Sequence, residues 1–275
     1  MGVLQHKVIL VSGASRGLGR AMAEGLAAAG AHLVLTANRG SQARLAEVIE
    51  GIAARGGKGR IVPVLGDITD AADCDSALQA AREHFGRLDV LFNNAGLGMD
   101  QVGPRTTNKR QFFNVPVDTW RRIVDTNMNG MFLMTRAALP LLTSAGRGRI
   151  VNITTSYDTM LREAFCPYGP CKAAAEAMTV IWSKELAAAG IAVNSLCPGG
   201  GVDTTMMPLE DWPDRSKLLP ASVMVAPAIW LASDESDGVT GMRIVAKNWD
   251  AALPPTEAFA KASSRVMIGD EAPAR

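Results

Sequence analysis

The amino-acid sequence predicts an α/β protein with a doubly wound parallel sheet of seven strands and helices on both faces. Two observations lead to this fold class. Short apolar segments alternate with longer amphipathic segments along most of the chain, and a glycine-rich turn follows the first apolar segment. Alternating strand and helix patterns favour parallel βαβ units, and continuous apolar runs are typical of strands that are buried on both faces.

The expected elements follow one another in a regular order. The strands are short runs rich in Val, Ile and Leu, at 7–12, 32–36, 60–65, 90–93, 149–153, 192–196 and 243–246. The helices have apolar residues at helical spacing, at 19–29, 41–55, 71–85, 117–142, 168–189 and 223–233.

We expect a single domain over 1–275, because no segment of linker composition divides the chain. Two polar or irregular stretches, near 97–116 and 199–222, follow the ends of expected strands. Ligands of doubly wound sheets bind at these ends, so both stretches are candidate substrate-covering loops, with plain surface insertions as the alternative. The remaining segment, 251–275, is expected to be a C-terminal surface extension.

Composition excludes several classes of protein. The formal net charge is +1, so we expect no nucleic-acid or membrane partner. No apolar run approaches the ~20 residues of a membrane-spanning helix, and no signal peptide is recognised, which favours a cytoplasmic protein. The four cysteines form no CxxC pair and the three histidines are scattered, so we expect reduced thiols and no metal site.

A glycine-rich turn connects the first strand to its helix. Gly13, Gly17 and Gly19 have the spacing GxxxGxG. Glycines let the backbone approach a pyrophosphate, and a helix N-terminus offers free N–H groups and the positive end of its dipole. Three glycines can also form a mere tight turn. In the cofactor interpretation, the contacts from this turn are Gly13, Ser15, Arg16, Gly17, Leu18 and Gly19.

This turn resembles that of the short-chain dehydrogenase/reductase family, which has a Rossmann-type fold. The segment 93–96 reads NNAG and matches a second motif of the family. The resemblance implies that Asn94, Ala95 and Gly96 line the adenosine ribose and stabilise the central sheet. It extends over roughly 7–246, and it departs from the family at 246–250, where two glycines are usual.

The residues after the second strand indicate NADP(H) as the cofactor. NAD-specific sites usually place an acidic residue here to bind the ribose 2′-hydroxyl, but this chain has Ala37, followed by Asn38 and Arg39. Arg16 and Arg39 could neutralise a 2′-phosphate, and the family resemblance implies the same preference. The alternative is that both arginines are solvated surface charges.

Asp67 and Ile68 follow the third strand. The resemblance implies that Asp67 contacts the adenine amine and that Ile68 packs on the ring. Asp67 could equally be the N-cap of the next helix.

Tyr168 and Lys172 are the strongest catalytic candidates. Residues four apart lie on one face of a helix. An adjacent ammonium favours the phenolate, so Lys172 is expected to lower the pKa of Tyr168, which then serves as general acid or base at the reacting oxygen. The resemblance implies that Lys172 also holds the nicotinamide ribose. The alternative is an ordinary surface pair.

Two further catalytic residues are assigned through the resemblance. The family has a serine 13 positions before the tyrosine, and this position is Thr155, with Ser156 as the alternative. Threonine keeps a hydroxyl that can polarise a carbonyl. Asn127 matches the family's helix asparagine, which distorts its helix and holds a water of the proton relay. Asn129 is the alternative.

The turn after the sixth strand completes the expected cofactor site. Pro198 and Gly199 match the family's turn under the nicotinamide. The resemblance implies a carboxamide contact from the backbone of Val202 and from Thr204, with Thr205 as the alternative.

The expected substrate is a small-molecule alcohol or ketone. Ser156, Tyr157 and Met206 are expected to contact it. An apolar wall suited to a medium-sized hydrophobic substrate, or alternatively a set of loop anchors, comprises Phe112, Phe113, Tyr157, Met160, Met206, Met207 and Trp212. The resemblance also implies a homotetramer, with a dimer as the alternative.

Together these features predict an NADP(H)-dependent ketoreductase or alcohol dehydrogenase. Two other functions remain open on the sequence: an NADP-dependent epimerase or dehydratase that uses the same Tyr–Lys pair, and a non-catalytic cofactor sensor on the same fold.

Overall fold

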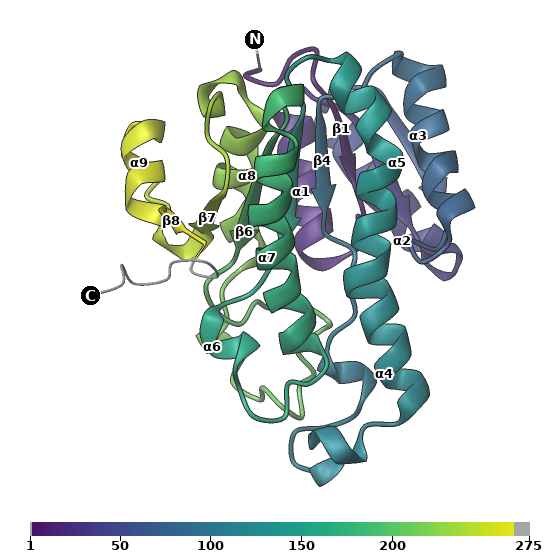
Figure 1. The fold of residues 1–275 in the computed structure, drawn as a ribbon, viewed down its shortest axis with the longest axis vertical. Coiled ribbons are helices and arrows are strands. Elements are labelled where there is room, and N and C mark those ends of the chain that lie inside the picture. The colour runs from purple at the N-terminus through teal and green to yellow at the C-terminus, as the bar shows by residue number, and fades with distance from the viewer. Residues whose placement is uncertain (1, 267–275) are drawn as a thin grey trace.

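The computed structural model describes residues 2–266 and contains one eight-stranded sheet (Figure 1). The strand order is β3-β2-β1-β4-β5-β6-β7-β8. All neighbouring pairs are parallel except β7 and β8, which are antiparallel. The strands are β1 (Val8–Val11), β2 (His32–Ala37), β3 (Ile61–Leu65), β4 (Val90–Asn93), β5 (Arg149–Ile153), β6 (Ala192–Cys197), β7 (Met242–Val245) and β8 (Ser263–Arg265).

Helices cover both faces of the sheet, as the sequence predicts. The helices are α1 (Gly17–Ala28), α2 (Gln42–Ala54), α3 (Ala71–Phe85), α4 (Val117–Val124), α5 (Gly130–Ser144), α6 (Tyr157–Met160), α7 (Tyr168–Glu185), α8 (Val225–Ala232) and α9 (Pro255–Ala262). Ile9 and Val11 of β1 pack with α1, α2 and α8, whereas Val8 and Leu10 pack with α3 and α5. Successive strand residues therefore supply the two cores in turn, which is why the strands read as continuous apolar runs.

The chain order creates a crevice at the centre of the sheet. From β1 the chain proceeds outward through β2 to β3, then returns to place β4 on the other side of β1. Ligands of doubly wound sheets bind at this switch point, beyond the carboxyl ends of the strands. The loops that follow β4 and β6, near 97–116 and 199–222, begin at this end.

The expected long helix over 117–142 is interrupted. A π-helical turn, Asp125–Asn129, separates α4 from α5. Such turns disturb the regular hydrogen bonding of a helix and are frequent at functional sites.

The C-terminal extension corrects two expectations. It was expected at the surface, but Ala258 and Ala262 of α9 are buried, and the ring of Phe259 stacks on Trp230 with centroids 4.6 Å apart. It also supplies β8, an eighth strand beyond the seven expected. The sequence did not indicate this strand, because the segment Ser263–Arg265 is polar and carries no strand pattern. The rest of the expected extension, 267–275, lies outside the described residues.

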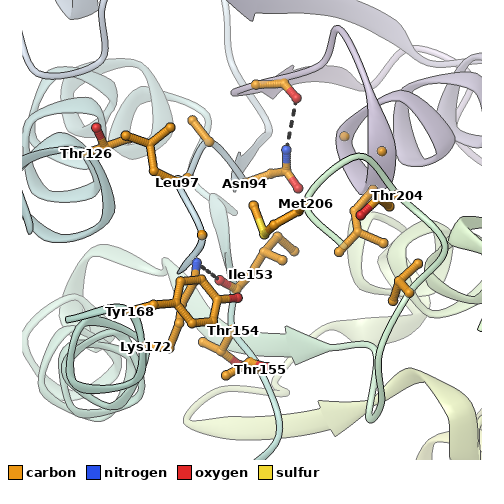
Figure 2. A pocket seen from close by; sticks show the side chains of 18 of the residues that line it. Asn94, Leu97, Thr126, Ile153, Thr154, Thr155, Tyr168, Lys172, Thr204 and Met206 are labelled. Atoms are coloured by element: carbon orange, nitrogen blue, oxygen red, sulfur yellow. Dashed lines mark hydrogen bonds between the residues drawn. The ribbon is translucent and has the colours of Figure 1, made fainter. Parts of the chain in front are cut away.

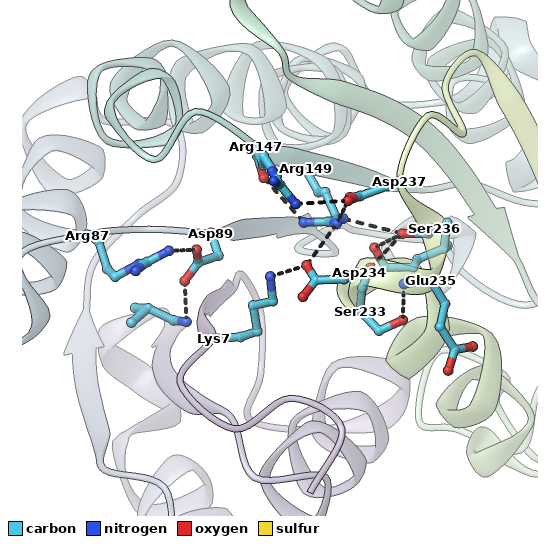
Figure 3. A network of polar contacts seen from close by, with 12 residues as sticks. Lys7, Arg87, Asp89, Arg147, Arg149, Ser233, Asp234, Glu235, Ser236 and Asp237 are labelled. Atoms are coloured by element: carbon cyan, nitrogen blue, oxygen red, sulfur yellow. Dashed lines mark hydrogen bonds and ion pairs between the residues drawn. The ribbon is translucent and has the colours of Figure 1, made fainter.

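A polar network stabilises the end of the sheet opposite the crevice (Figure 3). Arg149 of β5 is buried and forms ion pairs with Asp234 and Asp237. Lys7 also pairs with Asp234, at 2.5 Å, while Asp89 accepts a hydrogen bond from the backbone N–H of Val8 at 2.8 Å. The contacts of Lys7 and Arg149 join the starts of β1 and β5 to the segment after α8, and Asp89 joins the start of β4 to β1.

Among the described residues, no helix has both the length and the apolar character needed to cross a membrane.

Candidate active site

A cavity of about 880 Å³ lies beyond the carboxyl ends of the strands (Figure 2). Residues that follow β1 to β6 line it. The cavity therefore brings together most of the predicted cofactor residues: Gly13, Ser15, Arg16, Gly17, Leu18, Gly19, Asn38, Asp67, Ile68, Asn94, Ala95, Gly96, Pro198, Gly199, Val202 and Thr204. Arg39 is the predicted cofactor residue that does not line it.

The glycine turn is compact because three positions exclude a side chain. Gly13 has φ of +67°, and a Cβ atom there would lie 2.8 Å from the Cα atom of Ala95. A Cβ atom on Gly19 would collide with the carbonyl oxygen of Gly13 and the amide nitrogen of Asn94. Gly17 has φ of +55° and begins α1, and Arg16 makes no side-chain cap. The first N–H groups of α1 therefore remain available to an anion in the cavity.

The NNAG segment ties β4 to this turn. Asn94 Nδ2 donates to the carbonyl oxygens of Ser12 and Gly13, at 2.9 and 3.1 Å, and Figure 2 marks one of these two contacts. Ser12 Oγ accepts hydrogen bonds from the backbone N–H groups of Asn94 and Ala95. The segment thus holds the glycine turn in place while its own residues line the cavity.

Tyr168 and Lys172 lie together at the start of α7. Lys172 is buried, and its Nζ donates to the carbonyl oxygen of Ile153 at 2.8 Å (Figure 2). Its Nζ lies 5.8 Å from the centroid of the Tyr168 ring. The pair is therefore part of the cavity and not an exposed helix pair.

Asn127 sits inside the π-helical turn and approaches Lys172 across Gly96. Its Oδ1 accepts from the backbone N–H of Leu97 at 2.9 Å, and its Nδ2 donates to the carbonyl oxygen of Leu97 at 2.8 Å. A Cβ atom on Gly96 would lie 2.7 Å from Asn127 Oδ1 and 3.7 Å from Lys172 Nζ. The alternative residue, Asn129, instead bonds to Asp125 at the surface.

The geometry favours Thr155 over Ser156 as the hydroxyl beside Tyr168. Thr155 is buried, lines the cavity and has its hydroxyl on the side of Tyr168, whose pKa it lowers. Ser156 caps α6, with its Oγ 2.8 Å from Thr159 Oγ1. Its hydroxyl is thus engaged in local structure, although the residue still lines the cavity.

The pKa values of Tyr168 and Lys172 differ from the sequence expectation. Burial raises the pKa of Tyr168 to about 12, and the hydrogen bond with Thr155 offsets only part of this effect. Burial lowers the pKa of Lys172 to about 8. Desolvation thus outweighs the expected lowering of the Tyr168 pKa by the ammonium, because Lys172 Nζ is directed to Ile153 and not to the phenolic oxygen.

Arg39 lies outside the cavity because it pairs with Asp73. Its Nη1 and Nη2 atoms each lie 2.7 Å from an oxygen of that carboxylate. Asp73 Oδ2 also accepts from the backbone N–H of Asp67 at 2.7 Å. The pair is mostly exposed on the arginine side, so a 2′-phosphate can compete for the guanidinium. Arg16 is exposed at the mouth of the glycine turn.

Asp67 is not the helix N-cap. Asp70 caps α3 through the N–H of Ala72, whereas Asp67 Oδ1 accepts from the N–H and the hydroxyl of Thr69. Ile68 is partly buried beside Gly130 and lines the cavity.

The loop after β6 closes the other side of the cavity. Gly199 has φ of +86°, and a Cβ atom there would meet the side chain of Lys247 at 2.8 Å. Thr204 lies against the glycine turn, with its Cγ2 3.3 Å from the position of a Cβ atom on Gly17. Val202 is buried and pairs with Leu219 through a single parallel bridge.

The substrate half of the cavity is less apolar than the sequence suggested. Tyr157, Met206, Met207 and Trp212 line it. Phe112 and Phe113 do not; they are 66% and 70% exposed and pack edge to face on each other. Met160 is buried beneath α7 and is likewise absent from the lining.

The sequence analysis missed two acidic residues at the site, because neither belongs to a recognised motif. Glu176 is buried and accepts from Thr154 Oγ1 at 2.6 Å and from Ser195 Oγ at 2.7 Å, with Arg243 Nε at 3.2 Å. Asp100 lines the cavity in the loop after β4. For Glu176, its position one turn beyond Lys172 was a usable signal. For Asp100 the sequence offers none.

Among residues 2–266, no group of three or more potential metal-ligating side chains is found, and all four cysteines are free.

The fold and this cavity define an oxidoreductase that uses a nicotinamide cofactor. The chain belongs to the short-chain dehydrogenase/reductase family: the family model for short chain dehydrogenases matches residues 7–213. The 3-oxoacyl-[acyl-carrier-protein] reductase FabG of Escherichia coli K12 is 32% identical over 246 residues, which cover 86% of this chain and 94% of that protein.

Solved structures agree with this assignment. A proposed short-chain alcohol dehydrogenase from Sinorhizobium meliloti 1021 has a TM-score of 0.76 and 33% identity, covering 88% of this chain and 95% of that one. A proposed NAD(P)-dependent gluconate 5-dehydrogenase from Beutenbergia cavernae, with NADP bound at low occupancy, has a TM-score of 0.74 and 28% identity, covering 88% and 95%.

Proposed function

We propose that this protein is an NADP(H)-dependent ketoreductase that interconverts a ketone and a secondary alcohol. The observation that carries the proposal is the meeting of Thr155, Tyr168 and Lys172 at the floor of one cavity, next to a glycine turn that can hold a dinucleotide.

The residues present fit a dinucleotide. The free N–H groups at the start of α1 suit a pyrophosphate, and Gly96 leaves space beside Lys172 for another part of the dinucleotide. We assign Asp67, Ile68 and Asn38 to the adenosine and Val202 and Thr204 to the nicotinamide, since all five residues line the cavity. When bound, NADPH supplies the hydride.

The chain's own residues handle the substrate oxygen. Thr155 donates a hydrogen bond to the carbonyl oxygen, which orients it and draws charge towards it. Tyr168 then delivers its phenolic proton to that oxygen as negative charge develops there. Lys172 and Asn127 lie on the ribose side of the site. There they relay the proton that returns the Tyr168 phenolate to its protonated state.

The protonation state of Tyr168 suits the reduction step. Because its pKa is raised to about 12, the phenol holds its proton at neutral pH. A protonated tyrosine is ready to donate to a carbonyl oxygen, whereas alcohol oxidation starts from the phenolate, so the rate of oxidation should rise at alkaline pH.

We place NADP(H) before NAD(H) because Ala37 offers no carboxylate to a 2′-hydroxyl, while Arg16 lines the cavity and Arg39 lies just outside it, paired with the cavity-lining Asp73. Asp73 moderates this preference through its pair with Arg39.

The first test is a titration of purified protein with NADPH and with NADH, followed by a panel of aromatic, steroid, sugar and β-keto ester carbonyls. We expect tighter NADPH binding, loss of nicotinamide absorbance with some carbonyl, and no turnover in Tyr168→Phe. Preference for NADH would overturn the roles of Arg16 and Arg39. Failure to bind either nucleotide would overturn the enzyme assignment.

We also propose a homotetramer acting in the cytoplasm. Apolar side chains on the helical surface support self-association: Trp120 of α4, Phe132 of α5 and Ile181 of α7 are 37%, 47% and 51% exposed. The unpaired cysteines suit a reducing compartment. Light scattering during size-exclusion chromatography measures the assembly directly.

A further inference from the structure

Asp100 is a cavity-lining carboxylate whose two oxygens have different environments. It lies in a short 3-10 turn, Met99–Gln101, shortly after β4. Its Oδ2 accepts from Gln101 Nε2 at 2.6 Å, and Gln101 Oε1 in turn accepts from Arg122 Nη2 at 3.1 Å. This chain of contacts fixes the orientation of the carboxylate through one of its oxygens.

The other oxygen has no partner. Asp100 Oδ1 is shielded from solvent and accepts no hydrogen bond from any of the residues 2–266. A buried acceptor without a donor is unfavourable, and the few such groups in a folded protein need an explanation. A ligand that donates a hydrogen bond to Oδ1 would remove this penalty.

The surroundings of Oδ1 leave room for such a ligand once one side chain moves. A Cβ atom on Gly98 would lie 2.8 Å from Asp100 Oδ1 and 2.6 Å from Met206 Cγ. Glycine at 98 therefore gives the carboxylate its space, and the Met206 side chain covers the same place. Figure 2 shows Met206 projecting into the cavity. A methionine side chain is flexible and can withdraw.

Asp100 lines the same cavity as Thr155 and Tyr168. A substrate whose carbonyl oxygen is held by Thr155 and Tyr168 can therefore extend towards Asp100. The negative charge of Asp100 is also one of the causes that raise the pKa of Tyr168.

We propose that Asp100 Oδ1 accepts a hydrogen bond from a hydroxyl group of the substrate, so that the site takes hydroxylated ketones in preference to plain ones. This inference rests on the ketoreductase function proposed above. It makes Asp100 a specificity-determining residue and Met206 the side chain that gives way to the substrate.

A hydroxyl is favoured over an ammonium as the donor. Seven arginine and lysine side chains line the cavity, against five aspartates, and this excess of positive charge disfavours a positively charged substrate. A neutral hydroxyl donates to a carboxylate without adding charge, and such a bond is charge-assisted and strong.

The test compares ketones that differ only in a hydroxyl group, with NADPH as the reductant. Suitable pairs are 2-hydroxycyclohexanone with cyclohexanone, and 1-hydroxy-2-butanone with 2-butanone. The quantity measured is the ratio of kcat/KM within each pair for the wild type, Asp100→Leu, Asp100→Asn and Asp158→Asn. Asp158 is the matched control because it is an exposed carboxylate on the same cavity.

We expect the wild type to favour the hydroxylated ketone by about 100-fold or more, since a site built to bind a hydroxyl rejects the analogue that lacks it. The ratio should fall towards one in Asp100→Leu, take an intermediate value in Asp100→Asn, and stay at the wild-type value in Asp158→Asn. A ratio near one in the wild type, or an unchanged ratio in Asp100→Leu, overturns the proposal.

A binding measurement separates this inference from the proposed function. Binding of trans-1,2-cyclohexanediol and of cyclohexanol to the NADP⁺-loaded protein is followed by calorimetry. Preference for the diol that is lost in Asp100→Leu supports the role of Asp100 even if no carbonyl is reduced. Equal binding of both alcohols to wild type and variant overturns it, whether or not the protein reduces ketones.

Discussion

Arg110 and Asp211 form a buried ion pair that joins the two loops over the cavity, with Arg110 Nη2 2.6 Å from Asp211 Oδ2. Their side chains are 4% and 1% exposed. Arg110 Nε also donates to the carbonyl oxygen of Gly103 at 2.5 Å, and Asp211 Oδ1 accepts from the backbone N–H of Arg105 at 2.6 Å. Segments 101 positions apart are thus fastened together by one pair.

Breaking this pair should loosen both loops. Arg110→Ala or Asp211→Ala leaves a buried charge without its partner, which costs about 3–5 kcal/mol. We expect a lower midpoint of thermal unfolding, faster proteolysis within 97–116, and a higher KM for the ketone. Asp118→Ala is the control, because Asp118 pairs with Arg121 while 98% exposed, and it should change none of these. Equal behaviour of Asp211→Ala and the control would refute the fastening role.

The pair Glu176–Arg243 should position the catalytic hydroxyl. Arg243 is buried, and its Nη2 donates to the carbonyl oxygen of Thr155 at 2.7 Å while Glu176 balances its charge. We expect Glu176→Gln to lower kcat by about tenfold, since one misplaced group costs about 1.4 kcal/mol in the transition state.

In that variant, the affinity for NADPH in a fluorescence titration should stay within about twofold of the wild type. Thr154→Val removes another partner of Glu176 and leaves Arg243 paired, so it should lower kcat less. If both substitutions lower NADPH affinity and kcat together, the network serves general stability and does not position Thr155.

Asp73 should tune the choice of cofactor through Arg39. Asp73→Asn removes the charge that holds the guanidinium, so Arg39 becomes free to bind a 2′-phosphate. We expect the ratio of NADPH to NADH affinity to rise about threefold to tenfold in Asp73→Asn and to fall by a similar factor in Arg39→Ala. Fluorescence titration with both nucleotides measures this ratio. An unchanged ratio in both variants would show that Arg39 takes no part in cofactor selection.

Lys172 should destabilise the folded protein at neutral pH. Its pKa falls from an ordinary value of 10.5 to about 8 because of burial. Below pH 8 the folded protein therefore carries a buried ammonium, at a cost of about 3 kcal/mol. Between pH 8 and 10.5 only the unfolded chain binds this proton, so the penalty disappears as pH rises.

Lys172→Met should accordingly raise the free energy of unfolding at pH 7 by about 2 kcal/mol, after about 1 kcal/mol is subtracted for the lost hydrogen bond to Ile153. This gain should shrink between pH 8 and 10.5 in denaturant titrations. Lys184→Met, an exposed position on the same helix, is the control and should show no such pH dependence. A Lys172→Met variant that is less stable than the wild type at pH 7 would contradict the buried-ammonium account.

Much of the fold could be predicted because its signals are local. The bounds of β4, β5 and α3 agree with the sequence expectation, since apolar runs mark them directly, although the N-cap of α3 is Asp70 and not Asp67, which the sequence had offered as a candidate. The eighth strand could not be predicted, because its three polar residues join the sheet only through their pairing with β7.

The site was predictable where motifs carry it and not elsewhere. The glycine turn and the Tyr168–Lys172 pair have fixed spacings, and both line the cavity. The pairing of Arg39 with Asp73 depends on two segments that meet only in the folded chain, because the two residues are 34 positions apart. The exposure of Phe112 and Phe113 could not be predicted either. Their aromatic character suggested a pocket wall, but the loop places both side chains at the surface.

The two edge strands of the sheet limit how copies of the protein can associate. At one edge, β3 contains Pro63, which has no N–H group that could donate a hydrogen bond to an added strand. At the other, β8 covers the side of β7 and is only three residues long. Edge strands that are short or contain proline disfavour pairing with a strand from another chain. Among the described residues, we therefore expect helices and loops to form the contacts between copies. Fibre formation by pairing of sheet edges is disfavoured.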